Sequence, residues 1–215
     1  MNAAEVPEKR AGYELGKRAL DLAVVLPTAV VLSPLLAALA AVIKLESRGP
    51  VLFRQERVGR HGRPFEILKL RTLAAAPPSD PADFLISAGD ARITRVGAFL
   101  RRWSLDELPQ LWNIVRGDMS VVGPRPTIRY QVDQYTDVQR RRLEVTPGIT
   151  GWAQIHGRNR LSWPERIELD VWYVDHRSLR LDLTILLRTL PTLFRPGSVY
   201  GDAQGDWGER KARDA

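Results

Sequence analysis

The chain has 215 residues, of which 44% are hydrophobic and 27% are charged, enough for one medium-sized domain with a sizeable core. It contains no cysteine, which excludes disulfides, thiolate zinc sites and a cysteine nucleophile. The formal charge of +7 favours an anionic partner: nucleic acid, acidic lipid head groups or a phosphorylated substrate.

The N-terminal part of the chain is the most informative. Residues 1–16 are polar and unpatterned, and we expect them to be loosely ordered. Residues 22–43 contain no charged side chain, and a helix of that length reaches about 33 Å, close to the thickness of a bilayer's hydrocarbon core. The apolar run is too long for the core of a signal peptide. We therefore predict that residues 17–46 form a membrane anchor.

The topology of this anchor depends on Ser33 and Pro34. Pro34 removes one backbone hydrogen bond and its ring crowds the carbonyl of Val30, which predicts a kink. Basic residues flank the segment at both ends: Lys17, Arg18, Lys44 and Arg48. The positive-inside rule therefore gives no orientation. Two topologies stay open, a tilted single span and a re-entrant helix that breaks at Ser33-Pro34 and returns.

The remaining elements predict one mostly helical α+β domain over residues 47–196. Residues 51–58 and 65–71 alternate like strands around a turn at 59–62, which indicates a β-hairpin. Three prolines make residues 74–82 a loop. Apolar spacing and composition predict helices, the first interrupted near Pro109 and the last amphipathic, at 93–115, 127–143, 163–174 and 181–194. Residues 197–215 read as a polar tail.

The adjacent carboxylates of Asp106 and Glu107 are the first candidate for chemistry. Neighbouring helical side chains point about 100° apart, so such a pair can serve two partners, for example a phosphorus atom and a metal. The Ser-Leu-Asp-Glu sequence at residues 104–107 also has the pattern of a helix capping box, in which the acids interact with the helix dipole. The two roles are compatible, and both stay open.

Basic residues supply candidate phosphate ligands. Arg125 stands between two prolines in the Gly-Pro-Arg-Pro sequence at residues 123–126, which restricts the backbone of a side chain able to bind phosphate with two parallel hydrogen bonds. An ordinary proline turn is the alternative. Lys69 and Arg71 share one face of a strand, either toward phosphate or toward solvent. We expect the arginine run at residues 140–142 to be a solvated helix face.

Other chemistries find little support in the sequence. The three histidines are far apart and show no metal-ligand spacing: His61, His156 and His176. No Gly-x-Ser-x-Gly nucleophile motif and no nucleotide-binding P-loop motif occurs. The charge of +7 would suit a membrane-tethered nucleic-acid-binding protein, but no helix-turn-helix, RNA-recognition or OB-fold signature accompanies it.

Eight motifs in order resemble the bacterial sugar transferase family, the small monotopic phosphoglycosyl transferases. The resemblance covers about four fifths of the chain, and its motifs lie at residues 17–21, 33–34, 49–59, 69–72, 104–110, 117–126, 147–154 and 169–173. One departure is Leu73, where the family usually has Met. Each motif alone is modest, whereas eight in family order are very specific.

The resemblance implies a fold and a set of site residues. The fold would be a re-entrant membrane helix hairpin broken at Ser33-Pro34, followed by the catalytic domain and interfacial amphipathic helices. Asp106 matches the nucleophile that attacks the β-phosphorus and carries the sugar phosphate covalently, and Glu107 matches a ligand of an essential Mg²⁺. Polar positions around the phosphates and the metal are matched by Lys69, Arg101, Arg125 and Asp170.

The resemblance also implies an activity: transfer of a sugar 1-phosphate from a nucleotide diphosphate sugar, by family default a UDP-sugar, to a polyprenyl phosphate. This is the first membrane step of glycan assembly. The expected location is the bacterial inner membrane, with the catalytic domain facing the cytoplasm. A non-catalytic scaffold of the same fold is the rival, and the intact Asp106, Glu107 and Arg125 argue against it. A homo-oligomer is compatible with the sequence, and nucleic acid is not an expected partner.

Overall fold

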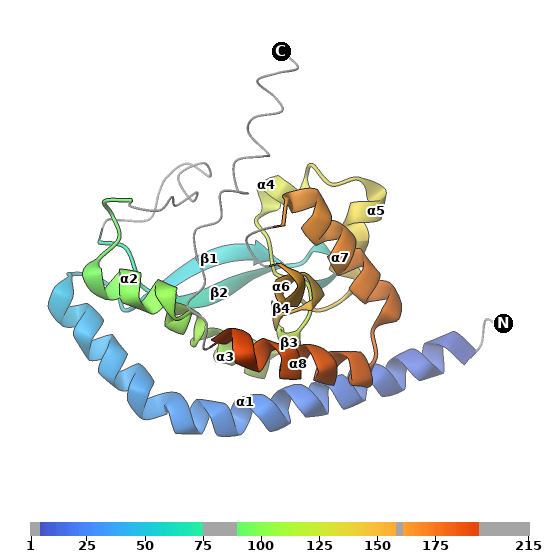
Figure 1. Cartoon of the computed structure of the whole chain (residues 1–215), viewed down its shortest axis with the longest axis horizontal. Coiled ribbons are helices and arrows are strands. Elements are labelled where there is room, and N and C mark those ends of the chain that lie inside the picture. Colours follow the sequence, from blue (N-terminus) through green and yellow to red (C-terminus); the bar gives the residue numbers. More distant parts are fainter. Residues whose placement is uncertain (1–4, 75–89, 158–160, 194–215) are drawn as a thin grey trace, which may run out of the picture.

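The structure, a computed structural model, describes residues 5–74, 90–157 and 161–193 (Figure 1). Almost all of the predicted loop at residues 74–82 and all of the polar tail lie outside the described residues. The described part is mostly helical, as predicted, and contains two small sheets. Its elements in chain order are α1 (Glu5–Glu46), β1 (Leu52–Val58), η1 (Arg60–Gly62), β2 (Pro64–Leu70), α2 (Arg95–Arg102), η3 (Leu105–Glu107), α3 (Gln110–Arg116), β3 (Ser120–Val122), α4 (Arg129–Val132), α5 (Asp137–Arg140), η4 (Arg141–Glu144), β4 (Gly148–Thr150), α6 (Trp152–His156), α7 (Trp163–His176) and α8 (Leu179–Leu193).

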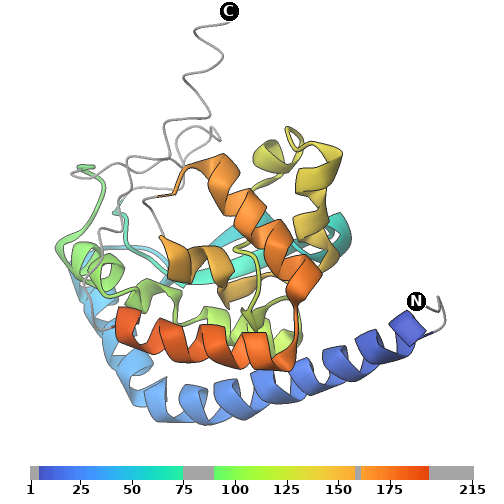
Figure 2. The ribbon, with the colours of Figure 1, turned by 45° about the vertical axis from the view of Figure 1, so that its right-hand side comes forward.

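The N-terminal helix α1 is continuous over 42 residues. The expectation of a loosely ordered N-terminal segment is wrong from Glu5 onward, because the helix already begins there. The re-entrant hairpin is not shown either: the helix runs through Ser33 and Pro34 and curves around the base of the domain instead of reversing (Figures 1 and 2). It is long and apolar enough to cross a membrane, by length and composition only.

Local side-chain bonding explains how the helix continues past Pro34. Proline lacks the amide hydrogen that would bind the carbonyl four residues earlier, which belongs to Val30. The Ser33 hydroxyl donates to that carbonyl at 2.8 Å and replaces the missing donor. The side chain of Ser33 thus satisfies the one acceptor that Pro34 leaves free, and the chain keeps its helical path.

The predicted β-hairpin is confirmed. Strands β1 and β2 pair antiparallel from Leu52 opposite Leu70 to Val58 opposite Pro64, around η1. A second sheet, the parallel pair of β3 and β4, was not predicted, because each strand has only three residues and their partners are far apart in sequence. It brings the segment before Gly123 beside the loop that begins at Pro147.

Two predicted helices are divided in the structure. The helix expected at residues 93–115 becomes α2, η3 and α3, because Ser104 adopts a left-handed conformation with φ 55° and α3 begins only after Pro109. The helix expected at 127–143 becomes the short elements α4, α5 and η4. The last two predicted helices, α7 and α8, are confirmed.

Helix α1 is joined to the rest of the domain along its length. Val25 packs in one core cluster with Ile67 and Ile114, and Ile43 packs in another with Leu70 and Leu100. Its two ends are held by polar contacts. Near the N-terminal end Arg60 donates to Glu14 at 3.2 Å, and beyond the C-terminal end Arg71 donates to the Ser47 carbonyl at 2.7 Å. Both ends of α1 therefore contact the same domain.

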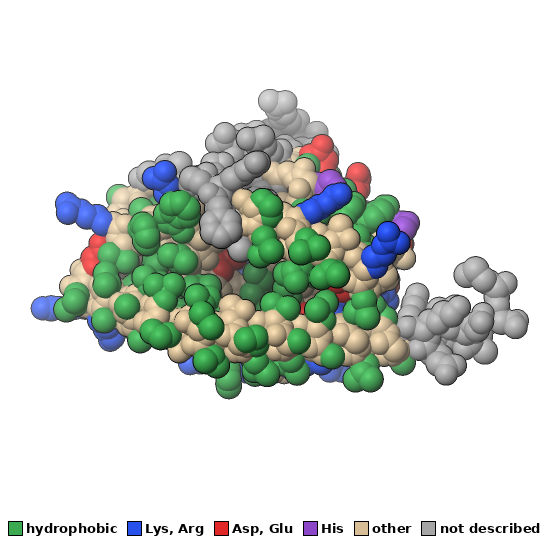
Figure 3. All heavy atoms as spheres, turned by 60° about the horizontal axis from the view of Figure 1, so that its bottom comes forward, with side chains coloured by type: hydrophobic (Ala, Val, Ile, Leu, Met, Phe, Trp, Pro, Cys, Tyr) green, Lys and Arg blue, Asp and Glu red, His purple; other side chains and the backbone are tan. Residues whose placement is uncertain are grey.

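The outer surface of α1 remains apolar and uncovered. Val30 and Val31 are 73% and 74% exposed, and only 6% of the most apolar stretch of the helix is buried. Figure 3 shows hydrophobic side chains gathered along α1 and over the elements beside it. On α8 four exposed leucines recur at three- or four-residue spacing, Leu179, Leu183, Leu187 and Leu190. A continuous apolar surface of this kind is typical of a membrane or protein contact, and an amphipathic α8 is confirmed.

A buried polar network fixes α1 against α7 and α8. Asp182 is fully buried and accepts hydrogen bonds from Lys17 at 3.0 Å, Tyr13 at 2.9 Å and Tyr173 at 2.6 Å. Next to it Asp21 accepts from the Ser120 hydroxyl and the Val121 amide, both at 2.9 Å. Buried charges require such partners, since an unpaired one is strongly unfavourable. The basic residue at the start of the predicted anchor is therefore a structural residue of the domain.

We predict that Asp182→Asn lowers the free energy of unfolding by about 3–5 kcal/mol, because it removes the charge that the buried Lys17 ammonium binds directly and leaves only the more distant carboxylate of Asp21. The measurement is urea unfolding of the detergent-solubilised protein. Asp133→Asn is the matched control, since Asp133 forms an exposed pair with Arg129 at 3.6 Å and its loss should change the value by less than about 1 kcal/mol. Equal effects of the two substitutions would show that the buried network does not stabilise the fold.

Candidate functional site

Asp106 and Glu107 lie in η3, a short turn between α2 and α3. The capping-box interpretation of this sequence is wrong: the Ser104 side chain makes no capping hydrogen bond, and its left-handed backbone directs the chain into the turn. The Glu107 side chain binds residues from other parts of the molecule instead. The pair is therefore free of the local role that the sequence pattern suggested.

The carboxylate of Glu107 is the point where three segments meet. The Lys69 ammonium, from β2, lies 3.2 Å from its Oε1. The Arg125 guanidinium binds both carboxylate oxygens, with Nη1 at 3.2 Å from Oε2 and Nη2 on Oε1. Lys69 and Glu107 are each largely buried, with 20% and 17% of the side chain exposed. The structure thus brings together three of the predicted site residues.

These contacts fix the charge of Glu107. Burial by itself raises the pKa of the Glu107 carboxyl, but the charges of Arg125 and Lys69, and their hydrogen bonds, outweigh it. The pKa of Glu107 consequently lies far below its ordinary value, and the group is ionised at neutral pH. Its negative charge in turn raises the pKa of Arg125.

Asp106 has a different environment from its neighbour. Among the described residues, none donates a hydrogen bond to its carboxylate. Burial, together with the nearby charge of Glu107, raises its pKa to about 6 against the lowering effect of Lys69. Arg101, in the last turn of α2, and Arg125 both lower it. Asp106 is therefore a carboxylate with cations nearby and, within the described part of the chain, without a hydrogen-bonded partner, which suits a group that must react.

The loop that carries Arg125 is held by close backbone contacts. A side chain at Gly123 would approach the Thr146 carbonyl to 2.5 Å, so only glycine fits here. The Gly123 amide donates to the Thr150 carbonyl at 2.8 Å, and the Gly148 amide donates to the Pro124 carbonyl at 2.9 Å. The predicted pre-organised arginine is thereby supported: Arg125 stands in a clamped loop and its guanidinium reaches Glu107.

Asp170, predicted to lie around the phosphates, is placed differently. It is 2% exposed and forms an ion pair with Arg142 at 2.5 Å. Burial raises the pKa of Asp170, and the charge of Arg142 acts against it. The charged groups that act on Asp170 are Arg142 and Arg166, and not Lys69, Asp106 or Glu107. The expectation of a solvated face at residues 140–142 is also wrong for Arg142, which is only 4% exposed.

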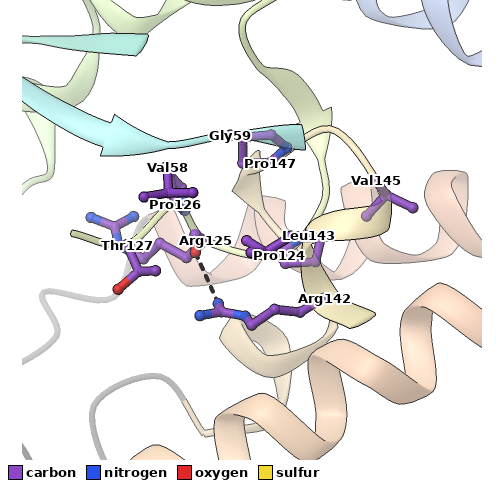
Figure 4. A pocket seen from close by; sticks show the side chains of 10 residues that line it. All are labelled: Val58, Gly59, Pro124, Arg125, Pro126, Thr127, Arg142, Leu143, Val145 and Pro147. Atoms are coloured by element: carbon purple, nitrogen blue, oxygen red, sulfur yellow. Dashed lines mark hydrogen bonds between the residues drawn. The ribbon is translucent and has the colours of Figure 1, made fainter. Parts of the chain in front are cut away.

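Sequence reasoning missed Arg142 because it stands in a run of three arginines that looks like a solvated face. Arg142 donates to the Arg125 carbonyl at 2.9 Å (Figure 4). It also helps to line a small pocket behind this loop, with Val58, Pro124 and Pro147 among the other lining residues. The pocket includes neither Asp106 nor Glu107, so it is distinct from the carboxylate pair.

The described residues contain no cluster of three or more acidic, histidine or cysteine side chains that could hold a metal by itself. The adjacent carboxylates of Asp106 and Glu107 nevertheless suit Mg²⁺. This ion is often held by one or two protein carboxylates together with substrate phosphates and water. The donor set therefore fits a magnesium ion that arrives with a phosphorylated substrate, with Glu107 as the ionised protein ligand.

Comparison with known proteins gives a consistent picture. Residues 12–196 match the family model described as bacterial sugar transferase. An uncharacterized sugar transferase of Bacillus subtilis is 45% identical over 174 residues, 81% of this chain and 85% of its own. A UDP-glucose:undecaprenyl-phosphate glucose-1-phosphate transferase of Caulobacter vibrioides is 44% identical over 90% of this chain and 75% of its own. A UDP-N-acetylgalactosamine-undecaprenyl-phosphate N-acetylgalactosaminephosphotransferase of Aeromonas hydrophila is 41% identical over 84% of this chain, which spans 44% of that protein.

We predict that the Asp106 carboxyl titrates with a pKa of about 6 and that its charged neighbours move this value in opposite directions. Lys69→Met should raise the pKa, because a nearby positive charge is lost, and Glu107→Gln should lower it, because a nearby negative charge is lost. The measurement is ¹³C NMR of carboxyl-labelled aspartate in magnesium-free buffer, with Asp106→Asn to assign the signal. An Asp106 pKa near 4 in all three proteins would contradict the proposed electrostatics.

Proposed function

The chain belongs to the bacterial sugar transferase family and is a transferase, and from this premise we propose that it moves a sugar 1-phosphate from a nucleotide diphosphate sugar to a polyprenyl phosphate. The observation that carries the proposal is the Asp106 carboxylate, which accepts no hydrogen bond from any described residue, beside an ionised Glu107 that binds Lys69 and Arg125. Relatives named for UDP-glucose and UDP-N-acetylgalactosamine support a UDP-sugar donor and undecaprenyl phosphate as the acceptor. Exopolysaccharide production proteins among the relatives support a role in starting glycan assembly.

In the proposed reaction Asp106 acts as the nucleophile. One carboxylate oxygen attacks the β-phosphorus of the donor, and a new P–O bond forms as the bridging P–O bond to the α-phosphate breaks. The bridging oxygen leaves with its electron pair on the nucleoside monophosphate. An oxygen of the polyprenyl phosphate then attacks the same phosphorus, and the bond to Asp106 breaks. The products are a polyprenyl diphosphosugar and the regenerated carboxylate.

The surrounding cations make this attack feasible. A carboxylate approaching a pyrophosphate is repelled by its negative oxygens, and positive groups in a partly buried site offset that repulsion. Lys69, Arg101 and Arg125 all act on the charge of Asp106 and are the proposed ligands of the donor phosphates. A Mg²⁺ held by Glu107 would neutralise phosphate charge and stabilise the leaving group. The hydrogen bonds of Lys69 and Arg125 to Glu107 keep both side chains at the site before substrate binds.

The arrangement of α1 supports a membrane-associated enzyme whose anchor does not cross the bilayer. Both ends of α1 contact the same catalytic domain, through Glu14 and Ser47, while its middle exposes an apolar surface. We infer that α1 enters one leaflet around Ser33 and Pro34 and returns, with both ends on the cytoplasmic side of the inner membrane. The active site would then lie at the membrane face, where the lipid phosphate is presented.

The catalytic proposal predicts that Asp106→Asn folds and binds the donor but shows no turnover at any magnesium concentration, because an amide cannot form the acyl phosphate. Intact-mass spectrometry after incubation with UDP-sugar alone should show one added sugar phosphate on the native protein and none on the variant. Asp133→Asn, on the exposed surface, should keep native activity and native labelling. Full activity of Asp106→Asn would exclude Asp106 as the nucleophile. Release of nucleoside monophosphate by the native protein, on addition of polyprenyl phosphate, would distinguish an enzyme from a non-catalytic scaffold.

The topology proposal predicts that both ends of α1 are reached only from the cytoplasm. Single cysteines at the exposed positions Ala11 and Arg48 are clean probes, because the chain has no cysteine of its own. A membrane-impermeant maleimide should label both in inside-out vesicles and neither in intact spheroplasts. Val31→Cys, in the exposed apolar middle, is the control and should resist labelling in both. Labelling of one end from outside would establish a transmembrane span.

A further inference from the structure

The side chain of Arg142 is buried at a place where the proposed mechanism has no use for it. Its Nη1 donates to the Tyr135 hydroxyl at 2.5 Å, and its Nη2 donates to Asp170 at 2.5 Å and to the Arg125 carbonyl at 2.9 Å. The guanidinium also lies over the rings of Tyr135 and Trp163, each 5.7 Å away. Burying this ion pair is expensive, and such pairs are weak contributors to stability, so a role in fixing geometry is the better explanation.

The target of Arg142 is the carbonyl of Arg125, which has no backbone donor among the described residues. The Pro124 carbonyl accepts from the Gly148 amide at 2.9 Å, and the Thr127 carbonyl accepts from the Val58 amide at 2.8 Å. Between them, the Arg125 carbonyl accepts a hydrogen bond from the Arg142 side chain. Arg142 thus completes the set of contacts that fixes this loop between β1 and β4.

The contacts of Arg125 point in two directions. Its carbonyl faces Arg142 on the pocket side of the loop, as Figure 4 shows, and its guanidinium binds Glu107 at the candidate active site. A rotation of the loop would move both groups together, because the prolines at 124 and 126 restrict the backbone on either side. The position of the guanidinium is therefore coupled mechanically to the bond between Arg142 and the carbonyl.

We propose that Arg142 is a positioning residue that holds the Arg125 guanidinium in place for binding the donor phosphates. Asp170 and Tyr135 act through it: Asp170 neutralises the buried guanidinium, and Tyr135 orients its other end. Asp170 therefore acts on the phosphate site indirectly, through Arg142, and does not contact the phosphates itself. The inference rests on the proposed function of Arg125 as a phosphate ligand.

The structure offers a sharp test, because replacing Arg125 by alanine removes its guanidinium but keeps its carbonyl. Any purely structural effect of losing Arg142 should therefore be the same with and without the Arg125 side chain. A positioning effect should appear only when that side chain is present. A double-mutant cycle between the two residues separates these cases.

Affinity for inorganic pyrophosphate, measured by calorimetry in detergent, is the first readout because it requires no turnover. Arg142→Lys keeps the charge but loses the planar set of donors, and it should weaken binding roughly ten-fold in the native background. In the Arg125→Ala background the same change should alter affinity by less than about two-fold. Arg141→Lys is the matched control, since Arg141 is exposed and pairs with Glu144 and Asp175, and it should leave affinity unchanged.

The rate of sugar phosphate transfer is the second readout, and Arg142→Lys should lower it roughly ten- to a hundred-fold, with no change for Arg141→Lys. If Arg142→Lys does not fold, Tyr135→Phe, which removes only a hydroxyl, should give a smaller loss of pyrophosphate affinity with the same dependence on Arg125. Native affinity in the folded Arg142 variant, or equal losses in both Arg125 backgrounds, would overturn the inference. A native protein that transfers no sugar phosphate would instead refute the proposed function, while the pyrophosphate cycle would still decide the role of Arg142.

Discussion

The arrangement of the site depends on one ionised carboxylate, that of Glu107. It binds Lys69 from the hairpin strand β2 and Arg125 from the loop after β3, although the three residues are far apart in sequence. A carboxylate in this position would be unfavourable without the two cations, and the cations would repel each other without the carboxylate. Asp106, one residue earlier, has its pKa raised by burial and forms no hydrogen bond with another side chain among residues 5–74, 90–157 and 161–193. One acidic residue is thus held in place and its neighbour is left to react.

A second layer of contacts supports this group from behind. The Arg125 loop is tied to β1, β4 and η4 by backbone hydrogen bonds and by the Arg142 side chain. On the side of the hairpin, the Asn113 side chain from α3 accepts from the Leu68 amide at 3.0 Å and donates to the Glu66 carbonyl at 2.7 Å, next to the strand position of Lys69. Each cation at the site is therefore carried by a backbone segment with fixed polar contacts. Such support reduces the conformational entropy that binding a phosphate would otherwise remove.

Helix α1 is an integral part of the same domain. Lys17 and Asp21 are buried in polar networks with Asp182 and Ser120, while Val25 and Ile43 contribute to two core clusters that also contain residues of the hairpin. The remaining surface of α1 is apolar and exposed. Sequence patterns distinguish these two surfaces poorly, because a long apolar helix looks the same whether one side of it meets lipid or protein.

The sequence by itself determined the family, the hairpin and the last two helices, because these depend on local motifs and periodicity. It also proposed the candidate site residues, among them Arg125, since two flanking prolines restrict a backbone wherever it is placed. Only the tertiary structure decided that Glu107 binds Lys69 and Arg125 instead of capping a helix, and that Ser104 turns the chain between α2 and α3. It also placed Asp170 behind the site with Arg142 and paired β3 with β4. The physical reason is the same in each case: the free energy of a buried charge or a short strand is set by partners distant in sequence, and no local pattern records them.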